Sequence, residues 1–194
     1  IIKRIFEETG IKLDVISGKK EAQITSKQDI SDHIGKSKNY CFVDVGGGST
    51  EVIIFKNSQI FKLKSFKIGC VRLLDDSVNN KTWNKFESWL IENAKELKKL
   101  KIVGIGGNIN KIFKISGTKH SKPLGKKSFL KTLKKIESMS INERLTVLKL
   151  NPDRADVIVP AGKIYYFILK TLKVKDIYVP KIGLADGMVN ELIK

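Results

Sequence analysis

Residues 40–55 read Tyr-Cys-Phe-Val-Asp-Val-Gly-Gly-Gly-Ser-Thr-Glu-Val-Ile-Ile-Phe, and this stretch decides the fold. The apolar, β-rich run before the three glycines predicts a buried strand, and the apolar run after them predicts a second one. The pair Asn57-Ser58 is a tight-turn signal, and the strict alternation of residues 59–68 predicts a third strand with one solvated face. We therefore expect residues 40–68 to form a three-stranded antiparallel meander.

Downstream of this meander the apolar residues recur at a different period. Between residues 83 and 97 they are spaced by three and four, which predicts an amphipathic helix. The other expected elements are a buried strand at 101–105, a helix from residue 108, helices at 126–137, 141–149 and 155–172, a strand at 176–179 and a helix at 184–193. The order β-β-β-α-β-α-β-α, with extra helices before the last strand, predicts an α/β protein with a five-stranded mixed sheet in the ribonuclease H-like arrangement.

Upstream of the meander the patterns are shorter. Residues 1–9 are expected to form a helix that Gly10 ends, and residues 11–16 alternate as a strand does. Residues 19–34 are expected to form a helix that carries Glu21.

The charge of the chain is unusual for a protein of 194 residues. Lysine and arginine number 37 against 20 acidic residues, so the net charge is +17, and such a field attracts polyanions. However, 33 of the 37 cations are lysine, whereas specific recognition of phosphates and bases favours arginine. Aromatic residues are not interleaved with the lysine-rich run at 119–135, so a nucleic-acid partner has little support. A general lysine bias on solvated faces explains the charge better than a dedicated groove.

The composition also excludes several classes of protein. No apolar run approaches the roughly 18 residues of a membrane span, and no cleavable signal peptide is visible. Cys41 and Cys70 cannot form a disulfide scaffold, so a cytoplasmic location is expected. His33 and His120 lack partners at zinc-ligand spacing, and neither cysteine has a nearby histidine that would make it a nucleophile.

The glycine-rich stretch at 46–48 has the residues that phosphate chemistry needs. Glycines lack Cβ atoms, so their backbone N–H groups can approach an anion closely, and Ser49 adds a hydroxyl donor. Asp44 and Glu51 flank this loop with carboxylates of the kind that hold Mg²⁺ or its bound water. The alternative is a flexible glycine-rich hairpin, which we consider less convincing because a hairpin needs only one or two glycines.

A second glycine-rich segment lies at 103–108, where a strand is expected to lead into a helix. Gly106 and Gly107 would let a phosphate lie over the helix N-terminus, where the N–H groups and the dipole favour negative charge. By itself this signal is weak, because two glycines before a helix are also ordinary turn chemistry.

The segment Asp-Val-Gly-Gly-Gly-Ser-Thr-Glu at 44–51 resembles the second phosphate loop of the exopolyphosphatase and guanosine pentaphosphate phosphohydrolase (Ppx/GppA phosphatase) family, within the actin-like ATPase superfamily. Further segments resemble that family in the same order along the chain. They are LDVISGKKEAQI (13–24), IGCVRL (68–73), VGIGGNINKI (103–112), NPDRADVIVPAGKI (151–164) and IGLADGMVNEL (182–192).

The resemblance implies that this chain is the second half of a longer catalytic core. Family members begin with another actin-like half, which carries the first phosphate loop, and that loop is absent here. Residues 1–35 would then lead in from the missing N-terminal half, and residues 36–194 would form the C-terminal phosphate-binding domain. The active site would lie in the cleft between the halves. Whether the protein forms a homodimer is left open.

The resemblance also assigns roles to individual residues. Glu21 matches the catalytic glutamate that orients and deprotonates the attacking water, while Asp44 and Glu51 match carboxylates associated with Mg²⁺. The expected phosphate-binding residues are Gly46, Gly47, Gly48, Ser49, Gly106, Gly107 and Arg154. Arg154 could instead cap and pair at its own helix start. The implied reaction removes the terminal phosphate of inorganic polyphosphate or guanosine pentaphosphate by in-line attack of water.

Two departures from the family pattern keep an alternative open. Lys20 replaces the first glutamate of a Glu-Glu pair, and Ala185-Asp186 replaces Arg and Glu in the closing motif. A catalytically weak regulatory module that binds phosphate or a nucleotide would need the glycine loops but no water-activating Glu21. A basic nucleic-acid-binding protein is a third, less supported reading.

Overall fold

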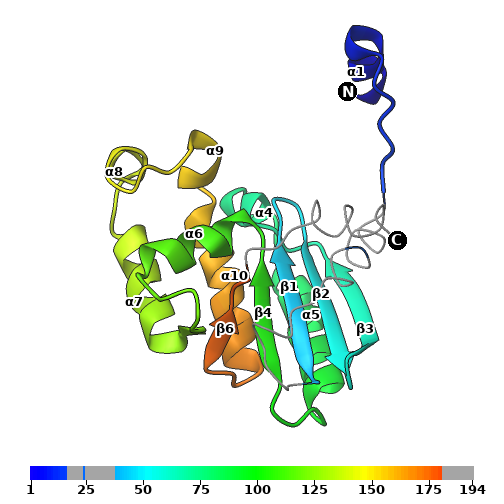
Figure 1. Ribbon diagram of the computed structural model, residues 1–194, viewed down its shortest axis with the longest axis vertical. Helices are drawn as coiled ribbons and strands as arrows, with labels where there is room; N and C mark the ends of the chain where they lie inside the picture. The colour runs from blue at the N-terminus through cyan, green and yellow to red at the C-terminus, as the bar shows by residue number, and fades with distance from the viewer. Residues whose placement is uncertain (17–23, 25–37, 181–194) are drawn as a thin grey trace.

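The computed structural model describes residues 1–16, residue 24 and residues 38–180. The described part contains one mixed sheet with the strand order β3-β2-β1-β4-β6-β5 (Figure 1). The strands are β1 (Tyr40–Val45), β2 (Thr50–Lys56), β3 (Gln59–Phe66), β4 (Lys101–Ile105), β5 (Leu124–Gly125) and β6 (Asp176–Tyr178). Strands β1, β4 and β6 run parallel, whereas β2 and β3 complete an antiparallel meander at one edge and β5 pairs antiparallel to β6 at the other.

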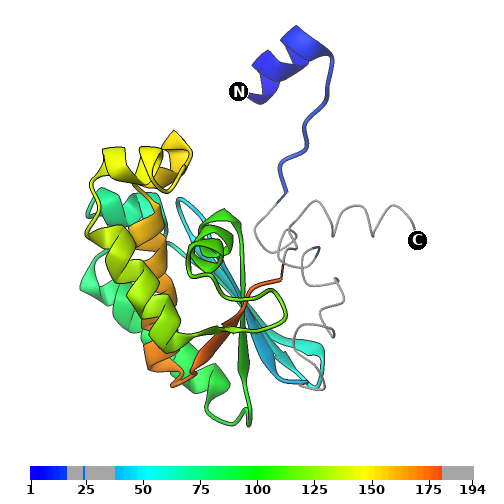
Figure 2. The same cartoon turned by 60° about the vertical axis from the view of Figure 1, so that its left-hand side comes forward.

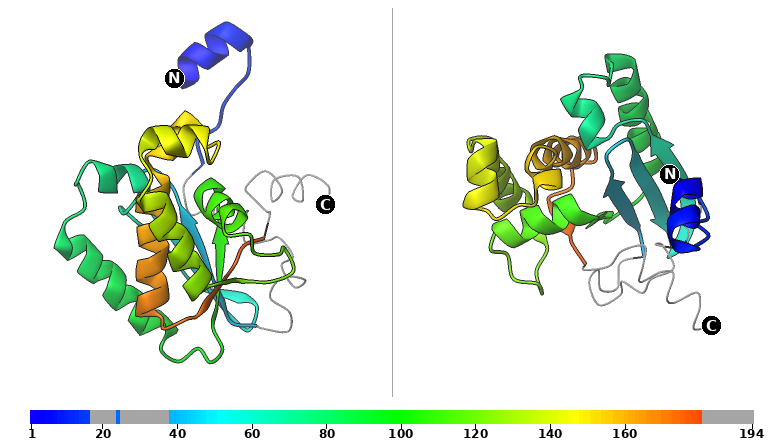
Figure 3. Two further views of the ribbon diagram at one scale, coloured as in Figure 1. Left: turned by 90° about the vertical axis from the view of Figure 1, so that its left-hand side faces the viewer. Right: turned by 90° about the horizontal axis from the view of Figure 1, so that it is seen from above.

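Helices cover one face of this sheet. The described helices are α1 (Ile2–Thr9), α4 (Cys70–Leu74), α5 (Asn80–Ala94), α6 (Gly107–Ile115), α7 (Lys126–Glu137), α8 (Ile141–Thr146), α9 (Pro152–Ala155) and α10 (Ile158–Thr171). Figure 2 shows α4, α5, α7 and α10 on the same side of the sheet, with α10 at the centre of this layer. Helix α1 extends away from the sheet and buries none of its residues (Figure 3).

The alternation of side chains along the strands divides the core in two. Odd-numbered residues of β1, such as Cys41 and Val43, join the large cluster under the helices. Even-numbered residues of β1 point to the opposite face and join a smaller aromatic cluster. That cluster consists of Tyr40, Phe42, Ile53, Phe55, Val103 and Ile105. Asp44 continues the same alternation, so its carboxylate lies on the face that the described helices leave uncovered.

Most of the predicted elements are present. The meander at 40–68 is confirmed, and so are the strand at 101–105, the helix at 126–137 and the helix that Gly10 ends with a φ of 71°. The sheet has six strands rather than five because the short β5 adds itself to the edge of β6. The predicted helix at 184–193 and, apart from Ile24, the predicted helix at 19–34 lie outside the described residues.

One predicted strand is absent, and one predicted helix begins later than expected. Residues 11–16 form no strand, because no strand of the described chain pairs with them, and Ile11, Leu13 and Val15 are exposed. The helix predicted at 155–172 is present as α10, but it begins at Ile158 because a break separates it from α9. Pro160 explains the break, since its ring would clash with the carbonyl group of Asp156 in a continuous helix. In the first turn of α10, which begins at Ile158, the missing N–H of the proline costs nothing.

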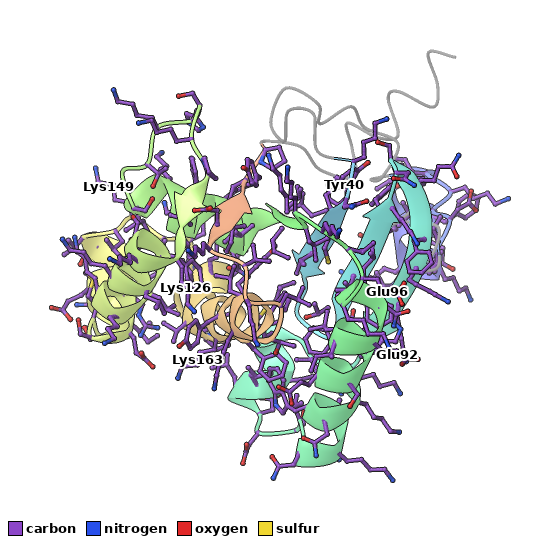
Figure 4. All side chains as sticks on the ribbon, turned by 90° about the horizontal axis from the view of Figure 1, so that it is seen from below. Tyr40, Glu92, Glu96, Lys126, Lys149 and Lys163 are labelled. Atoms are coloured by element: carbon purple, nitrogen blue, oxygen red, sulfur yellow. The ribbon has the colours of Figure 1, made fainter. Side chains whose placement is uncertain are left out.

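The positive charge is spread over several elements. Figure 4 labels Lys126, Lys149 and Lys163, which come from α7, from the segment after α8 and from α10 respectively. Lys163 is paired with Glu137 at 2.8 Å. This distribution agrees with the interpretation of lysine bias on solvated faces.

Candidate functional site

The first glycine-rich loop is the tip of the β1–β2 hairpin. The N–H of Gly46 donates to the carbonyl oxygen of Ser49 at 2.9 Å and closes the turn. Gly47 and Gly48 are exposed, and no hydrogen bond within the described part of the chain uses their backbone N–H groups. The loop is therefore a hairpin in its geometry. Its two outermost donors nevertheless remain available to an anion, as the phosphate-loop interpretation requires.

Helix α4 holds this loop from its other side. The N–H groups of Cys70 and Val71 donate to the carbonyl oxygens of Gly46 and Gly47, both at 3.0 Å. Arg72 Nε donates to the carbonyl oxygen of Gly48 at 2.7 Å. These contacts point the loop carbonyls toward α4 and leave the opposite edge of the loop to its N–H groups. Arg72 thus holds the loop against α4.

Gly69 permits this close approach and was missed by reasoning from the sequence. A Cβ atom at position 69 would collide with the backbone of Gly47 and Gly48. The residue lies in the IGCVRL segment, so its position in the motif was visible. The sequence did not show why glycine is needed at this position, because Gly69 and Gly47 are 22 positions apart.

Two carboxylates and a serine form a row across three strands. Asp44 of β1 is paired with Glu51 of β2, and Glu51 is paired with Ser65 of β3. Directly opposed residues project to the same face with Cβ atoms about 5 Å apart. Glu51 Oε1 accepts hydrogen bonds from Ser49 Oγ at 2.6 Å and from Ser65 Oγ at 2.7 Å. The predicted metal-associated residues are therefore brought together at the base of the first glycine loop.

The second glycine-rich loop meets the same carboxylate. Gly106 has a φ of +94°, a conformation that favours glycine, and a Cβ atom there would lie 2.6 Å from Asp44 Oδ1. Gly107 is packed against Arg154, whose Nη2 would lie 2.6 Å from a Cβ at this position. Arg154 Nη1 also donates to the carbonyl oxygen of Gly107 at 3.5 Å. Asp44 thus lies near the end of the strand that leads into the first loop and packs against the second loop, which also contacts Arg154.

Tyr165 forms hydrogen bonds with β1 and β4, the two strands that lead into the glycine-rich loops. It lies in α10, is almost fully buried, and places its hydroxyl 2.8 Å from the carbonyl oxygen of Val43 and 3.0 Å from that of Ile105. Burial raises the pKa of this phenol well above its usual value, and the nearby charge of Asp44 raises it further. Tyr165 therefore stays neutral and keeps its proton for these carbonyls. In the sequence it is visible only as a residue of the helix predicted at 155–172.

The two cysteines are buried near the site and are not activated. Burial raises the pKa of the Cys41 thiol to about 12, and it also raises the pKa of the Cys70 thiol. Both thiols are protonated at neutral pH and are poor nucleophiles. Asn108 Nδ2 lies 3.9 Å from Cys70 Sγ, while its Oδ1 is buried without a partner among the described residues.

The donor set fits a magnesium ion better than a transition metal. Within the described residues, no three or more His, Cys, Asp or Glu side chains are grouped so that they could hold a metal ion by themselves. Mg²⁺ needs fewer protein ligands, because it keeps several waters and binds through one or two carboxylates together with substrate phosphates. Asp44 and Glu51, beside a loop with unused N–H donors, match that requirement. Glu21, Lys20 and Ala185 lie outside the described residues, so their predicted roles stay predictions.

The meander, its glycine-rich first hairpin and the following parallel strands define an α/β domain with the actin-like ATPase fold. The sequence matches the Ppx/GppA phosphatase family over residues 1–194, and the chain belongs to this family. Within residues 1–16, residue 24 and residues 38–180, no helix is long and apolar enough to cross a membrane.

Relatives and solved structures agree with this assignment. The chain is 28% identical over 200 residues to a guanosine-5′-triphosphate,3′-diphosphate pyrophosphatase of Photobacterium profundum, a match that covers 95% of this chain and 39% of the relative. It is 39% identical over 120 residues to a bifunctional 3-dehydroquinate synthase/phosphatase of Fusobacterium nucleatum, covering 55% of this chain and 18% of that protein. An exopolyphosphatase structure from Cytophaga hutchinsonii superimposes with a TM-score of 0.78 at 22% identity, covering 99% of this chain and 69% of that one.

These matches also show what share of each relative's length this chain covers. It spans about two fifths of the length of the curated pyrophosphatase relative and about two thirds of the solved exopolyphosphatase. The predicted division at residues 35 and 36 is not tested by these matches and stays a prediction.

Proposed function

We propose that the protein is a phosphohydrolase that removes the terminal phosphate of inorganic polyphosphate, of guanosine pentaphosphate or of both, and that this chain supplies one side of its active site. The observation that carries the proposal is the meeting of Asp44 and Glu51 beside the unused N–H groups of Gly47 and Gly48. A terminal phosphoryl group needs both kinds of partner, because its negative charge must be matched by donors and by a cation.

The residues divide the work between them. The N–H groups of the first glycine loop bind the terminal phosphoryl oxygens, and Asp44 and Glu51 hold Mg²⁺. When bound, Mg²⁺ neutralises charge on the phosphate oxygens and helps to orient the substrate. Arg154 lies against the second glycine loop, where its guanidinium group extends the positive potential toward a longer phosphate chain.

Glu21 is proposed as the base that orients the attacking water and takes its proton. A carboxylate is adequate for this step where burial and a metal ion tune its basicity. The cleft is proposed to close against a preceding actin-like half, since solved family members extend well beyond the length of this chain. Closure of the cleft displaces bulk water, and each electrostatic contact inside the cleft becomes stronger as a result.

The test is phosphate release by the full-length gene product in Mg²⁺, measured separately with long-chain polyphosphate and with guanosine pentaphosphate. Glu21→Gln is compared with Glu92→Gln, a matched loss of charge on the exposed face of α5. We expect Glu21→Gln to lower the rate roughly 100-fold or more, as for loss of a general base, and Glu92→Gln to leave it unchanged.

Binding of each substrate is measured on the same variants. Retained binding with lost release supports the role of Glu21, and the faster substrate identifies the preference. Binding without release in the unaltered protein would favour the regulatory module instead. Equal release by Glu21→Gln and the unaltered protein would contradict Glu21 as the base.

A further inference from the structure

Ser65 contributes to the site from β3, a strand that no motif of the sequence connected with the chemistry. It is the cross-strand partner of Glu51, so both side chains project to the face that carries Asp44. Ser65 Oγ donates to Glu51 Oε1 at 2.7 Å. Ser49 Oγ donates to the same oxygen at 2.6 Å.

Two hydroxyl donors on one carboxylate oxygen fix how the group is turned. Oε1 is occupied by both serines, whereas Oε2 has no hydrogen-bond partner among the described residues. A carboxylate held at one oxygen presents the other in a defined direction, which is how neighbouring groups orient metal ligands. We propose that Ser65 is a positioning residue that turns Glu51 so that Oε2 is presented, together with Asp44, to a divalent cation.

The choice of a neutral donor supports this role. The chain contains 33 lysines, and two of them, Lys64 and Lys67, lie within two residues of Ser65 in the sequence. No ion pair within the described part of the chain involves Glu51, whose polar partners are the two serines. Hydroxyl groups orient the carboxylate without neutralising it, so its full charge is kept for a cation.

The hydroxyl group of Ser65 contributes little to the stability of the fold. The side chain is exposed, and a hydrogen bond at such a position adds little to stability. Strand β3 is already paired with β2 from Gln59 to Phe66, with one shift of register between Ile54 and Phe55. Removal of one hydroxyl should therefore leave the fold intact and change the behaviour of Glu51.

The inference rests on the proposed function for the cation at Glu51, so its test includes a measurement that needs no turnover. Mn²⁺ binding is titrated by electron paramagnetic resonance on the full-length gene product and on Ser65→Ala, Ser65→Thr and Ser65→Val. Threonine keeps the hydroxyl, and valine has the same shape without it. Ser88→Ala, at an exposed position of α5, is the control.

We expect Ser65→Ala and Ser65→Val to weaken Mn²⁺ binding about tenfold or more, as is typical when a group that orients a metal ligand is lost. Ser65→Thr and Ser88→Ala should bind as the unaltered protein does, and all four variants should melt at similar temperatures. In phosphate release, Ser65→Ala should lower kcat and leave KM for polyphosphate nearly unchanged.

Equal Mn²⁺ affinity of the threonine and valine variants would overturn the proposal. The same conclusion follows if Ser65→Ala binds Mn²⁺ normally while the unaltered protein hydrolyses its substrate, a result that leaves the proposed function standing. If the unaltered protein binds Mn²⁺ but releases no phosphate, the proposed function fails and the titration still decides the role of Ser65.

Discussion

The two glycine-rich loops look alike in the sequence and differ in why they contain glycine. At Gly106 the fold itself requires glycine, because φ is +94° and a Cβ atom would collide with Asp44, whereas a Cβ atom at Gly107 would meet only the guanidinium end of Arg154. At Gly48 the nearest atom to a built Cβ is Arg72 Nε at 4.0 Å, which is an ordinary contact. The fold gives no reason for a missing side chain at Gly48, which agrees with the proposal that a phosphate approaches this loop from outside.

This difference shows that glycines in the two loops serve different purposes. The loop that exposes unused N–H groups contains Gly48, where the fold would accept a side chain, and the second loop contains Gly106, which the fold requires and which packs against Asp44. The comparison predicts that substitutions will separate stability from ligand binding along the chain, and four of them test it.

Gly69→Ala should have the largest effect on stability. Its Cβ would collide with the backbone of Gly47 and Gly48, and backbone atoms cannot rotate away as a side chain can. We expect a loss of about 3 kcal/mol in the free energy of unfolding, at the upper end for overpacking, measured by urea denaturation. A loss below about 1 kcal/mol would show that α4 and the first loop can move apart.

Gly106→Ala should come next. Alanine at a φ of +94° is strained, and its Cβ would displace the carboxylate of Asp44. The expected loss is about 2 kcal/mol in urea denaturation, within the range for backbone strain. Because Asp44 moves, Mn²⁺ affinity should fall as well. Unchanged stability would remove the contrast between the loops.

Tyr165→Phe should cost less than either glycine substitution. The ring still fills its place in the core, but the carbonyl groups of Val43 and Ile105 lose a donor inside the protein. The expected loss is roughly 1–2 kcal/mol, as for a hydrogen bond removed from a buried acceptor. Tyr166→Phe, a partly exposed neighbour on α10, is the matched control and should be close to neutral.

These substitutions also mark the limit of what the sequence could predict. The meander, the helix at 126–137 and the placing of Asp44, Glu51 and the glycines near one another follow from local periodicity and from strand pairing. The roles of Gly69, Ser65 and Tyr165 depend on contacts between residues that are distant in the sequence. Tyr165, for example, bonds to a carbonyl group 122 residues away. A pattern of apolar spacing places such a tyrosine on a buried face and says nothing about its hydroxyl.

Gly48→Ala should have the smallest effect on stability and a clear effect on binding. Its φ lies outside the left-handed region, and the added Cβ meets only an ordinary contact. The free energy of unfolding should therefore fall by less than about 0.5 kcal/mol or rise slightly. The methyl group would nevertheless stand at an exposed loop tip, where a phosphate needs close access to the N–H groups. Loss of one charge-assisted hydrogen bond, worth about 1.5–3 kcal/mol, corresponds to roughly a tenfold or greater loss of affinity for tripolyphosphate by calorimetry. If binding is unchanged while the fold is intact, the first loop is not the anion site, and the second loop, with Arg154, becomes the stronger candidate.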